Sequence, residues 1–556
     1  MKTFIALSLL LFTEPLIAQQ TVGLFTQNTG SMDGYILFAP TRADSTYLID
    51  KCGKRIHQWS SNYMPGLSVY LLPNGNLLRS GFYQPNYFSA PGGLIETYDW
   101  NNNLLWSYVI CDSTETQNHD IYPMPNGNIL VVIWEKYTVQ QAIASGRKPQ
   151  FLGSELWSAK IQEIQPVGNS AANIVWEWRM WDHLVQDFDN TKDNYGVISD
   201  HPELLNINFT GPNPTALDWL HMNAVSYNEA LDQIVISSHT LSEIYILDHS
   251  TTTAEAATHS GGARGKGGDF LYRWGNPAAY NRGTAGDQRL FLQHSPDWIP
   301  AGYKDANKII IFNNGVNRPI GNASSVDIIT PPVDSLGNYI INTGQAFEPV
   351  NAEWSYMDSV PNDFFSGIMG GAQRLPNGNT LICESTKGNF FEIDTMNNTV
   401  WRYVNPVNNA GIISQGTVAT GNNSYRSVFY PVDYVGLAGK NLTPGDPIEL
   451  NPLTYTCTMN TTTGLNDQGN ATGSSISLRN PAVKTITLTS EKDIKNLEVI
   501  LYSVSGKTLC RWNSININEN GVVNLPLDEN LTSGIYFLGL SNAEVNRTLK
   551  LIRLND

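Results

Sequence analysis

Short apolar runs joined by tight polar turns recur between residues 35 and 437, and this pattern predicts antiparallel β-hairpins. Three of the turns share the sequence Pro-Asn-Gly-Asn, within residues 70–80, 122–132 and 373–385, and looser versions occupy residues 224–237 and 295–312. Asn-Gly between alternating apolar residues is a strong hairpin signal, because both residues tolerate positive φ. We therefore expect a strand on each side of these five turns.

A second kind of hairpin alternates with the first, and its last strand closes on tryptophan. The six tryptophans concerned are Trp59, Trp106, Trp178, Trp274, Trp354 and Trp401. Two hairpins in each of six repeats make six four-stranded sheets, which predicts an all-β fold with a six-bladed β-propeller. The first repeat begins near Tyr35 and lacks an inner strand, so we expect residues 427–437 to supply it and close the ring. Two β-sandwiches in tandem would leave the alternation unexplained.

The two ends of the chain differ from the repeats. Residues 1–18 combine Lys2, an apolar run and a small residue at Ala18, which predicts a secretory signal peptide. The propeller is expected over residues 19–437. Residues 438–475 are rich in Asn, Thr, Gly and Pro and are expected to form a linker. Apolar strands with glycine turns then predict a small C-terminal β-sandwich over residues 476–556.

Composition and charge narrow the classes of function. Of 556 residues, 41% are apolar and 15% charged, which suffices for a large core. The formal net charge of −16 argues against binding nucleic acid or an anionic membrane. Five cysteines are too few and too scattered for a disulfide framework or a cysteine zinc site. One disulfide is expected, with Cys52–Cys111 as the favoured pairing.

Three of the nine histidines fall at equivalent places in the repeat. His119, His221 and His294 each open the strand that leads into an inner hairpin. Rotational symmetry would carry all three to one height around the central channel, and His221 and Asn223, two residues apart, would share the face that looks into it. A lone strand histidine is more often a hydrogen-bonded structural residue, but three in register indicate a ligand site.

A ring of neutral imidazoles supports two chemistries. Three histidines can hold zinc or copper with one position open. Alternatively, one imidazole is a nucleophile while the others and Asn223 contact an anionic group in transfer. Carboxylates that would orient metal-bound imidazoles are not obvious beyond Asp120 and Asp218. Metal binding is therefore the lesser interpretation, and we expect no metal and no cofactor in the reaction.

The chain resembles the arylsulfate sulfotransferase family between residues 35 and 437. The motifs that carry the resemblance are DWLHMN, DFLYRWGNP, GDQRLFLQHSPDWIP, FNNGVNRP and GGAQRLPNGNTL, in the order the family has them. The resemblance implies a six-bladed propeller that moves a sulfuryl group from a phenolic sulfate ester to a phenol, through a sulfohistidine and without a nucleotide donor. It makes His294 the nucleophile, His221 and Asn223 ligands of the sulfuryl oxygens, and His119 the remaining channel histidine.

The sequence departs from the family where enterobacterial members have a sulfate-binding arginine, about one hairpin after His221. That segment, residues 235–248, has His239 and no arginine. Protonated His239, Arg318 or Arg264 would supply the cation instead, with Lys266 beside Arg264 as a further choice. The glycine-rich loop 261–268 lacks the Ser or Thr of a phosphate-binding loop; a flap near the site and a solvated insertion are equally good interpretations. Residues 177–189, with Asp182 and His183, are expected to form a structural aromatic plug.

The last 80 or so residues resemble the C-terminal sorting domain of the type IX secretion system, in SLRNP, LYSVSGK and GIYFLGL. The resemblance implies export to the cell surface or medium, with the secretion machinery as a partner. Taken together, the sequence predicts an exported arylsulfate sulfotransferase acting on small phenolic donors and acceptors, with a homodimer left open. A metal-dependent hydrolase or lyase using the histidine ring, and a non-catalytic surface-binding propeller, are the alternatives.

Overall fold

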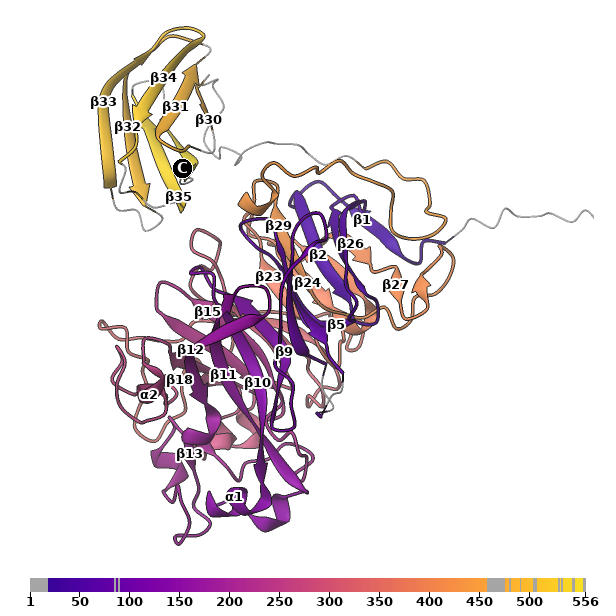
Figure 1. The fold of residues 1–556 in the computed structure, drawn as a ribbon, viewed down its shortest axis with the longest axis vertical. Coiled ribbons are helices and arrows are strands. Elements are labelled where there is room, and N and C mark those ends of the chain that lie inside the picture. The colour runs from indigo at the N-terminus through magenta and orange to yellow at the C-terminus, as the bar shows by residue number, and fades with distance from the viewer. Residues whose placement is uncertain are drawn as a thin grey trace, which may run out of the picture. The chain divides into compact units, whose positions relative to one another are not determined.

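The computed structural model divides the chain into two compact units, Met1–Thr461 and Thr462–Asp556. It describes residues 19–84, 87–88, 91–457, 476–479, 482–490, 492–503, 508–528, 531, 534–542 and 546–553. The predicted signal peptide, residues 1–18, lies outside the described residues, as do residues 458–475 of the predicted linker. Both units consist mainly of β-strands (Figure 1), so the all-β prediction is confirmed.

Six antiparallel sheets make up most of the first unit. Within each sheet we number four strands from first to fourth, in the order in which they are hydrogen-bonded to one another. The first three sheets are β29 (Ser424–Pro431), β2 (Gly34–Pro40), β3 (Ser45–Asp50) and β4 (Arg55–Ser60); β5 (Pro65–Leu71), β6 (Leu77–Phe82), β7 (Gly93–Tyr98) and β8 (Leu104–Val109); and β9 (Glu115–Pro123), β10 (Ile129–Thr138), β11 (Glu155–Val167) and β12 (Ala171–Arg179). The last three are β15 (Met222–Asn228), β16 (Gln233–Ser238), β17 (Glu243–Asp248) and β18 (Tyr272–Trp274); β19 (His294–Trp298), β20 (Ile309–Asn313), β21 (Ser325–Ile329) and β22 (Trp354–Tyr356); and β23 (Gly371–Arg374), β24 (Thr380–Glu384), β25 (Asn389–Ile393) and β26 (Thr399–Val404), with β1 (Gly23–Gln27) added beyond β26.

The predicted turns fall where the sequence placed them. The three Pro-Asn-Gly-Asn turns join β5 to β6, β9 to β10 and β23 to β24, and the two looser turns join β15 to β16 and β19 to β20. All six tryptophans lie on the fourth strand of a sheet, namely β4, β8, β12, β18, β22 and β26. The first-sheet prediction is also confirmed, because β29 pairs with β2 and thereby supplies the missing first strand from the far end of the unit.

The six first strands contact one another in a closed ring, in the order β29, β5, β9, β15, β19, β23 and back to β29. We refer to these strands as the inner ring. The tryptophans link neighbouring sheets further out. Five indole N–H groups donate to a backbone carbonyl in the next sheet or in a loop between its strands, in the pairs Trp59–Asp99, Trp106–Ala171, Trp178–Gly268, Trp274–Pro349 and Trp401–Lys51. The last pair joins the sixth sheet to the first. At the remaining boundary, the Arg374 guanidinium lies 4.8 Å from the centre of the Trp354 ring.

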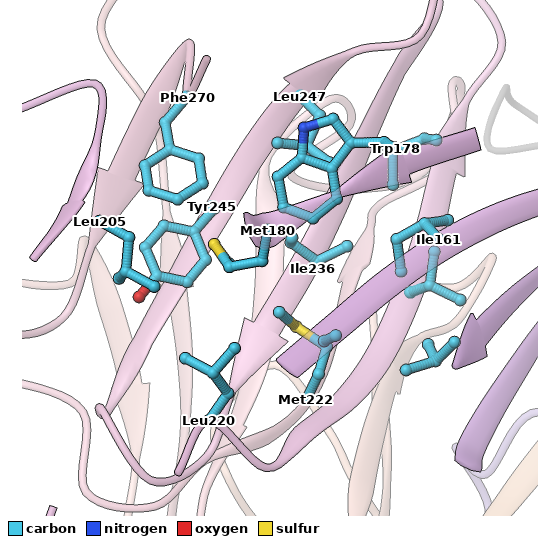
Figure 2. Packing of buried hydrophobic residues seen from close by; sticks show 14 of the residues in the cluster. Ile161, Trp178, Met180, Leu205, Leu220, Met222, Ile236, Tyr245, Leu247 and Phe270 are labelled. Carbon is cyan, nitrogen blue, oxygen red and sulfur yellow. The ribbon is translucent and has the colours of Figure 1, made fainter. Parts of the chain in front are cut away.

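Apolar side chains fill the space between neighbouring sheets. The largest cluster lies between the third and fourth sheets, where Trp178, Ile236 and Leu247 pack together with Met180 (Figure 2). Trp178 is 1% exposed and the two aliphatic side chains are fully buried. Burial of this kind contributes about 25 cal/mol per Å² of apolar surface and holds the sheets, and so the inner ring, in fixed positions.

The connection from β12 to β15 is the long insertion of the first unit. It carries the short parallel pair β13 (Leu184–Val185) and β14 (Leu205–Asn206). The two α-helices are short as well: α1 (Val139–Ala144) follows β10, and α2 (Thr253–Ala256) precedes β18. Among the described residues, no helix is long and apolar enough to cross a membrane. A last small hairpin, β27 (Val407–Asn408) with β28 (Gly411–Ile412), precedes β29.

The disulfide differs from the favoured pairing. Cys52 is bonded to Cys457, at an S–S distance of 2.07 Å and a separation of 405 residues, so the prediction of Cys52–Cys111 is wrong. The reason is the path of the chain after β29. Pro447 bridges to Lys54 and Leu450 to Ser414, and these contacts bring the segment back along the first unit as far as Cys457. The first part of the predicted linker is thus packed against the sheets.

The second unit contains two sheets. One is three-stranded, with β30 (Ile476–Arg479), β31 (Thr485–Ser490) and β34 (Gly521–Pro526). The other is four-stranded, with β33 (Thr508–Ile517), β32 (Ile494–Ser503), β35 (Gly534–Ser541) and β36 (Asn546–Arg553). Buried residues of both sheets, such as Leu488 and Leu538, share one hydrophobic cluster. The alternating burial along β31 is what a sheet with one buried face requires.

Candidate active site

Four histidines lie close together at the inner-ring strands of the third, fourth and fifth sheets. His119 lies on β9, His221 directly precedes β15, His294 begins β19, and His239 directly follows β16. Ring centroids are 4.7 Å apart for His119 and His221, 4.9 Å for His221 and His239, 5.1 Å for His239 and His294, and 6.4 Å for His119 and His294. The predicted three histidines are therefore brought together, with His239 as a fourth. We call this set the histidine cluster.

The backbone departs from regular strand geometry at the histidine cluster. His119 and His221 have φ of 51° and 46°, and Ser295, next to His294, has φ of 50°. The ladders of β9, β15 and β19 shift register at the same places, and that of β5 shifts in the same way around Leu67. Non-glycine residues with positive φ are strained, and β-bulges re-aim side chains next to functional sites. Strict alternation therefore does not govern His221 and Asn223.

His294 is held in one orientation and one tautomer. Its Nδ1 lies 2.8 Å from Asn314 Oδ1. The Asn314 amide nitrogen donates to the carbonyls of Ser366 and Met369, both at 2.7 Å, so Oδ1 is the atom that faces the imidazole. An amide oxygen only accepts, so Nδ1 carries the proton and Nε2 the lone pair. Among the described residues, the one hydrogen bond to Nε2 is a long contact of 3.3 Å from the Met369 N–H.

Burial keeps three of the four imidazoles uncharged. It lowers the pKa of His294 to about 3; the hydrogen bond to Asn314 opposes the shift, and charge on His221 and Arg426 adds to it. The pKa values of His119 and His239 are also lowered well below their usual value, by burial and then by the neighbouring histidines. His119 resembles His294 in detail, because its Nδ1 lies 2.8 Å from Asn118 Oδ1 and the Asn118 amide donates to the Met222 carbonyl.

His221 differs from the other cluster members by having a carboxylate partner. Its Nδ1 lies 2.5 Å from Asp218 Oδ2, and its backbone N–H donates to Asp218 Oδ1 at 2.9 Å. A carboxylate fixes the tautomer with the proton on Nδ1 and stabilises the imidazolium when Nε2 takes up a second proton. The His221 side chain is 31% exposed, whereas His294 is 2% exposed. Solvent therefore reaches the histidine cluster past His221.

Asn223, predicted to contact substrate, is fully buried between two strands of the inner ring. Its amide nitrogen donates to the Gln293 carbonyl at 2.8 Å, and its backbone carbonyl accepts from the Tyr425 hydroxyl at 2.6 Å. Its side-chain oxygen is buried with no hydrogen-bond partner among the described residues. In this structure, Asn223 ties β15 to the residue before His294.

The predicted cations lie in different surroundings. His239 belongs to the histidine cluster, but burial lowers its pKa, which argues against a protonated His239 at neutral pH. Arg264 donates to the carbonyls of Leu336 and Gly337 in the turn between β21 and β22. Arg318 donates to Ser325 and lies 5.5 Å from the Phe291 ring. None of the contacts described for the two arginines involves a cluster histidine.

Arg426 on β29 is the cation that the sequence interpretation missed. Its Nη2 pairs with Asp120 Oδ1, the residue after His119, and donates to the Tyr70 hydroxyl at 2.8 Å. Its guanidinium lies 4.8 Å from the ring of Tyr425, which is itself 6.4 Å from His119 and 6.5 Å from His294. All its side-chain hydrogen bonds to described residues run through Nη2. The sequence did not indicate Arg426 because β29, which carries it, joins the inner ring from the C-terminal end of the first unit.

Aromatic and apolar surfaces border the histidine cluster. The Trp134 ring lies 6.1 Å from His119 and 5.7 Å from His221, and its buried Nε1 has no hydrogen-bond partner among the described residues. A cavity of about 240 Å³ is lined by none of the cluster histidines but by residues close to two of them in sequence. Its lining includes Thr240, which follows His239, together with Phe209, Phe291 and Leu292. These surfaces suit a small aromatic ligand.

The histidine cluster is not arranged as a compact metal site. Within the part of the chain that the structure describes, one group of three His, Cys, Asp or Glu side chains has ligand atoms all within 4.8 Å of one another. That group is His183, His259 and Asp269, outside the inner ring. Amide partners on His119 and His294 also differ from the carboxylates or carbonyls that usually orient metal-bound imidazoles.

Residues 25–426 match the family model of arylsulfotransferase (ASST). The match covers most of the chain, and it includes every member of the histidine cluster. The chain therefore belongs to the arylsulfotransferase family. Residues 480–553 match the secretion system C-terminal sorting domain, which indicates export by the type IX route to the cell surface or the extracellular space.

Comparison with curated proteins found no match. Among solved structures, the chain is similar to a protein of unknown function from Bacteroides caccae, at 11% identity over 67% of this chain and 94% of that one, with a TM-score of 0.34. It is similar to AztD from Citrobacter koseri, at 9% identity over 72% and 99%, with a TM-score of 0.32. It is similar to virginiamycin B lyase from Staphylococcus aureus, at 10% identity over 68% and 88%, with a TM-score of 0.31. At these TM-scores, the three likenesses carry no argument about function.

Proposed function

We propose that the chain is an arylsulfate sulfotransferase that moves a sulfuryl group from a phenolic sulfate ester to a phenol through a sulfohistidine on His294, without a nucleotide donor. Membership of the arylsulfotransferase family supports the class of reaction. The observation that carries the mechanism is the fixed tautomer of His294, which presents an uncharged Nε2 because its pKa is about 3. Such a nitrogen is nucleophilic at neutral pH.

In the first half-reaction, His294 Nε2 forms a bond to sulfur while the bond from sulfur to the phenolic oxygen breaks. The phenolate takes a proton from the Nε2 of His221, whose imidazolium is stabilised by Asp218. The Met369 N–H, 3.3 Å from His294 Nε2, then becomes available to a sulfuryl oxygen. In the second half-reaction, His221 takes the proton of the acceptor phenol, whose oxygen bonds to sulfur as the N–S bond breaks.

The remaining site residues stabilise charge and place the substrate. Sulfuryl transfer, like phosphoryl transfer, depends mostly on positioning and on stabilising charge at the peripheral oxygens. Arg426, which is paired with Asp120 and whose charge acts on His294, takes the place of the arginine expected near residue 239. His119 and His239 are uncharged. The Nε2 of His119 carries a lone pair, as that of His294 does, so it accepts a hydrogen bond from the phenol hydroxyl, whereas the ring N–H of His239 can donate to a sulfuryl oxygen. The cavity beside Thr240, with Phe209 and Phe291 in its wall, suits the aryl ring.

We further propose that the six sheets are the blades of a six-bladed β-propeller over residues 19–437, with the histidine cluster in its central channel. The closed inner ring and the tryptophan bonds around it support this architecture. Residues 1–18 would be removed as a signal peptide, residues 438–475 would link the units, and residues 476–556 would form a β-sandwich read by the secretion machinery. The two sheets sharing one hydrophobic cluster support the sandwich.

The test is turnover of para-nitrophenyl sulfate in the presence of a phenol acceptor and a chelator, followed through release of para-nitrophenol. Acceptor-dependent release that falls by roughly 10⁴-fold or more in His294→Ala is expected for loss of a nucleophile. A quenched wild-type sample should carry one sulfuryl group on His294 by mass spectrometry. His201→Ala, which changes a histidine that is 43% exposed, is the control. Turnover that needs added zinc or copper, or full activity in His294→Ala, would overturn the proposal.

A further inference from the structure

A second group of histidines lies where the glycine-rich loop 261–268 meets the insertion between β12 and β15. His259 precedes this loop, Asp269 follows it, and His183 comes from the insertion. Asp269 Oδ1 lies 2.8 Å from His183 Nδ1 and 2.8 Å from His259 Nδ1. Residues that are distant in sequence therefore place two imidazole nitrogens on one carboxylate oxygen.

The hydrogen bonds of His183 leave two acceptor atoms, one on His183 and one on Asp269, facing each other. His183 Nε2 lies 2.8 Å from the Ala256 carbonyl, which can only accept, so Nε2 carries a proton. In the neutral imidazole, Nδ1 then carries a lone pair, and it faces Asp269 Oδ1, which also only accepts. A positive charge between the two atoms resolves the mismatch. It can be a second proton on His183 or a metal ion bound to Nδ1.

Several features fit the metal ion. Metal-bound histidine usually donates its other N–H to a backbone carbonyl or a carboxylate, as His183 does to Ala256. Two imidazoles and one carboxylate are ligands that suit zinc. Ligand atoms bound at about 2.0 to 2.1 Å around a tetrahedral zinc lie about 3.3 Å apart, so distances of 2.8 Å need only a small expansion. His259 is 61% exposed, which leaves a route for the ion and a position for water.

The surrounding residues fix His183 in place. Its ring is fully buried and stacks on Trp178, with ring centroids 5.6 Å apart and an angle of 3° between the planes. Trp178 in turn donates to the Gly268 carbonyl at 2.7 Å. A Cβ on Gly268 would lie 2.0 Å from the Ala256 carbonyl oxygen and 2.5 Å from His183 Nε2, so only glycine allows this approach. Two of the three ligands are thus held by the folded core.

We propose that His183, His259 and Asp269 bind one zinc ion, with water at the remaining position, and that the ion fastens both ends of the glycine-rich loop to the insertion. The site is outside the histidine cluster and takes no part in sulfuryl transfer. It gives the loop a role that the sequence left undecided between a flap and a solvated insertion. Because metal binding to the folded state adds to stability, the ion should also raise the melting temperature.

The experiment uses the full chain, stripped with a chelator, equilibrated with zinc at micromolar free concentration, and separated from unbound ion. We expect about one zinc per chain by elemental analysis, and a melting temperature that rises with zinc but not with magnesium. His259→Ala should lower zinc affinity by roughly tenfold or more while leaving the metal-free melting temperature unchanged, because His259 is exposed. His201→Ala is the matched control, since His201 is also exposed and its Nδ1 also contacts a carboxylate, that of Glu203.

Two further variants make the result decisive. Asp269→Asn should lose zinc as well, and His221→Ala, which alters the histidine cluster, should keep it. The proposal is overturned if the wild-type chain retains no zinc, since a second proton then resolves the contact between His183 and Asp269. It is equally overturned if His259→Ala binds zinc as tightly as the wild type, or if His221→Ala is the variant that loses it.

Discussion

The molecule places its histidines in two kinds of surroundings, the inner ring and the outer parts of the sheets, and the partners of the imidazoles differ between them. In the inner ring, His119 and His294 face the side-chain oxygens of Asn118 and Asn314. The amide fixes the tautomer, and although its hydrogen bond to His294 favours the charged form, burial outweighs it and the pKa falls. The result is a neutral nitrogen with an available lone pair.

In the outer region, four histidines face carboxylates, namely His183, His201, His249 and His259. His57 on β4 is the exception: it packs against Trp59 and Trp100, and burial lowers its pKa. His249, which follows β17, has Nδ1 2.7 Å from Asp232 and Nε2 2.9 Å from Glu163. Burial alone would lower its pKa, but the hydrogen bonds to Glu163 and Asp232 outweigh burial and raise it. His183 also faces a carboxylate, that of Asp269. A carboxylate partner therefore favours a charged imidazole, whereas beside an amide partner burial leaves the imidazole neutral with an available lone pair.

His221 is an exception to this difference between inner and outer histidines, because it belongs to the histidine cluster and has a carboxylate partner. Replacing Asp218 with Asn should lower kcat by roughly 10² to 10⁴, since the imidazole loses both the fixed tautomer and the charge that stabilises its protonated form. The loss should be smaller with donors whose phenols are more acidic, because their leaving oxygen needs less help from an acid. A series of substituted phenyl sulfates under single-turnover conditions measures this dependence. An equal loss across the series would assign Asp218 a structural role only.

Asn314→Asp replaces the amide partner of His294 with a carboxylate, the kind of partner that His249 has in the outer region. The carboxylate should favour the imidazolium and raise the pKa of His294 from about 3 by roughly one to three units. Because only the neutral imidazole is a nucleophile, kcat should fall by at most about tenfold at pH 5 and by less at pH 8. Full pH profiles of kcat check the shift.

Asn314→Leu is the control for this change, because it removes the same hydrogen bonds without adding a charge. Its loss should be similar at both pH values. If the two variants gave parallel pH profiles, a carboxylate beside His294 would not change the charge of the imidazole.

The sequence predicted the elements that depend on local chemistry. The Pro-Asn-Gly-Asn turns and the closing tryptophans located the hairpins, because turn type and strand alternation are set by neighbouring residues. His119, His221 and His294 were found because they occupy one position of a repeat. The missed features depend on long-range contacts: Arg426 reaches the site on β29, Asn314 reaches His294 from beyond β20, and Cys457 returns to Cys52. Positive φ at His119 and His221 was also missed, since histidine carries no turn signal there.

The smallest expected effect concerns stability and leaves catalysis unchanged. His249→Gln removes a clamp between Glu163 on β11 and Asp232 in the turn from β15 to β16, and should cost about 1 to 3 kcal/mol of unfolding free energy at pH 6. Because the pKa of His249 is raised above 6.5, its stabilising contribution is complete below pH 6.5 and is lost as the pH rises through the folded-state value. The gap between variant and wild type should therefore narrow by pH 9. Urea denaturation at both pH values measures it, with His201→Gln as an exposed control. A gap that widened with pH would mean that His249 is neutral in the folded chain and does not differ in charge from His119 and His294.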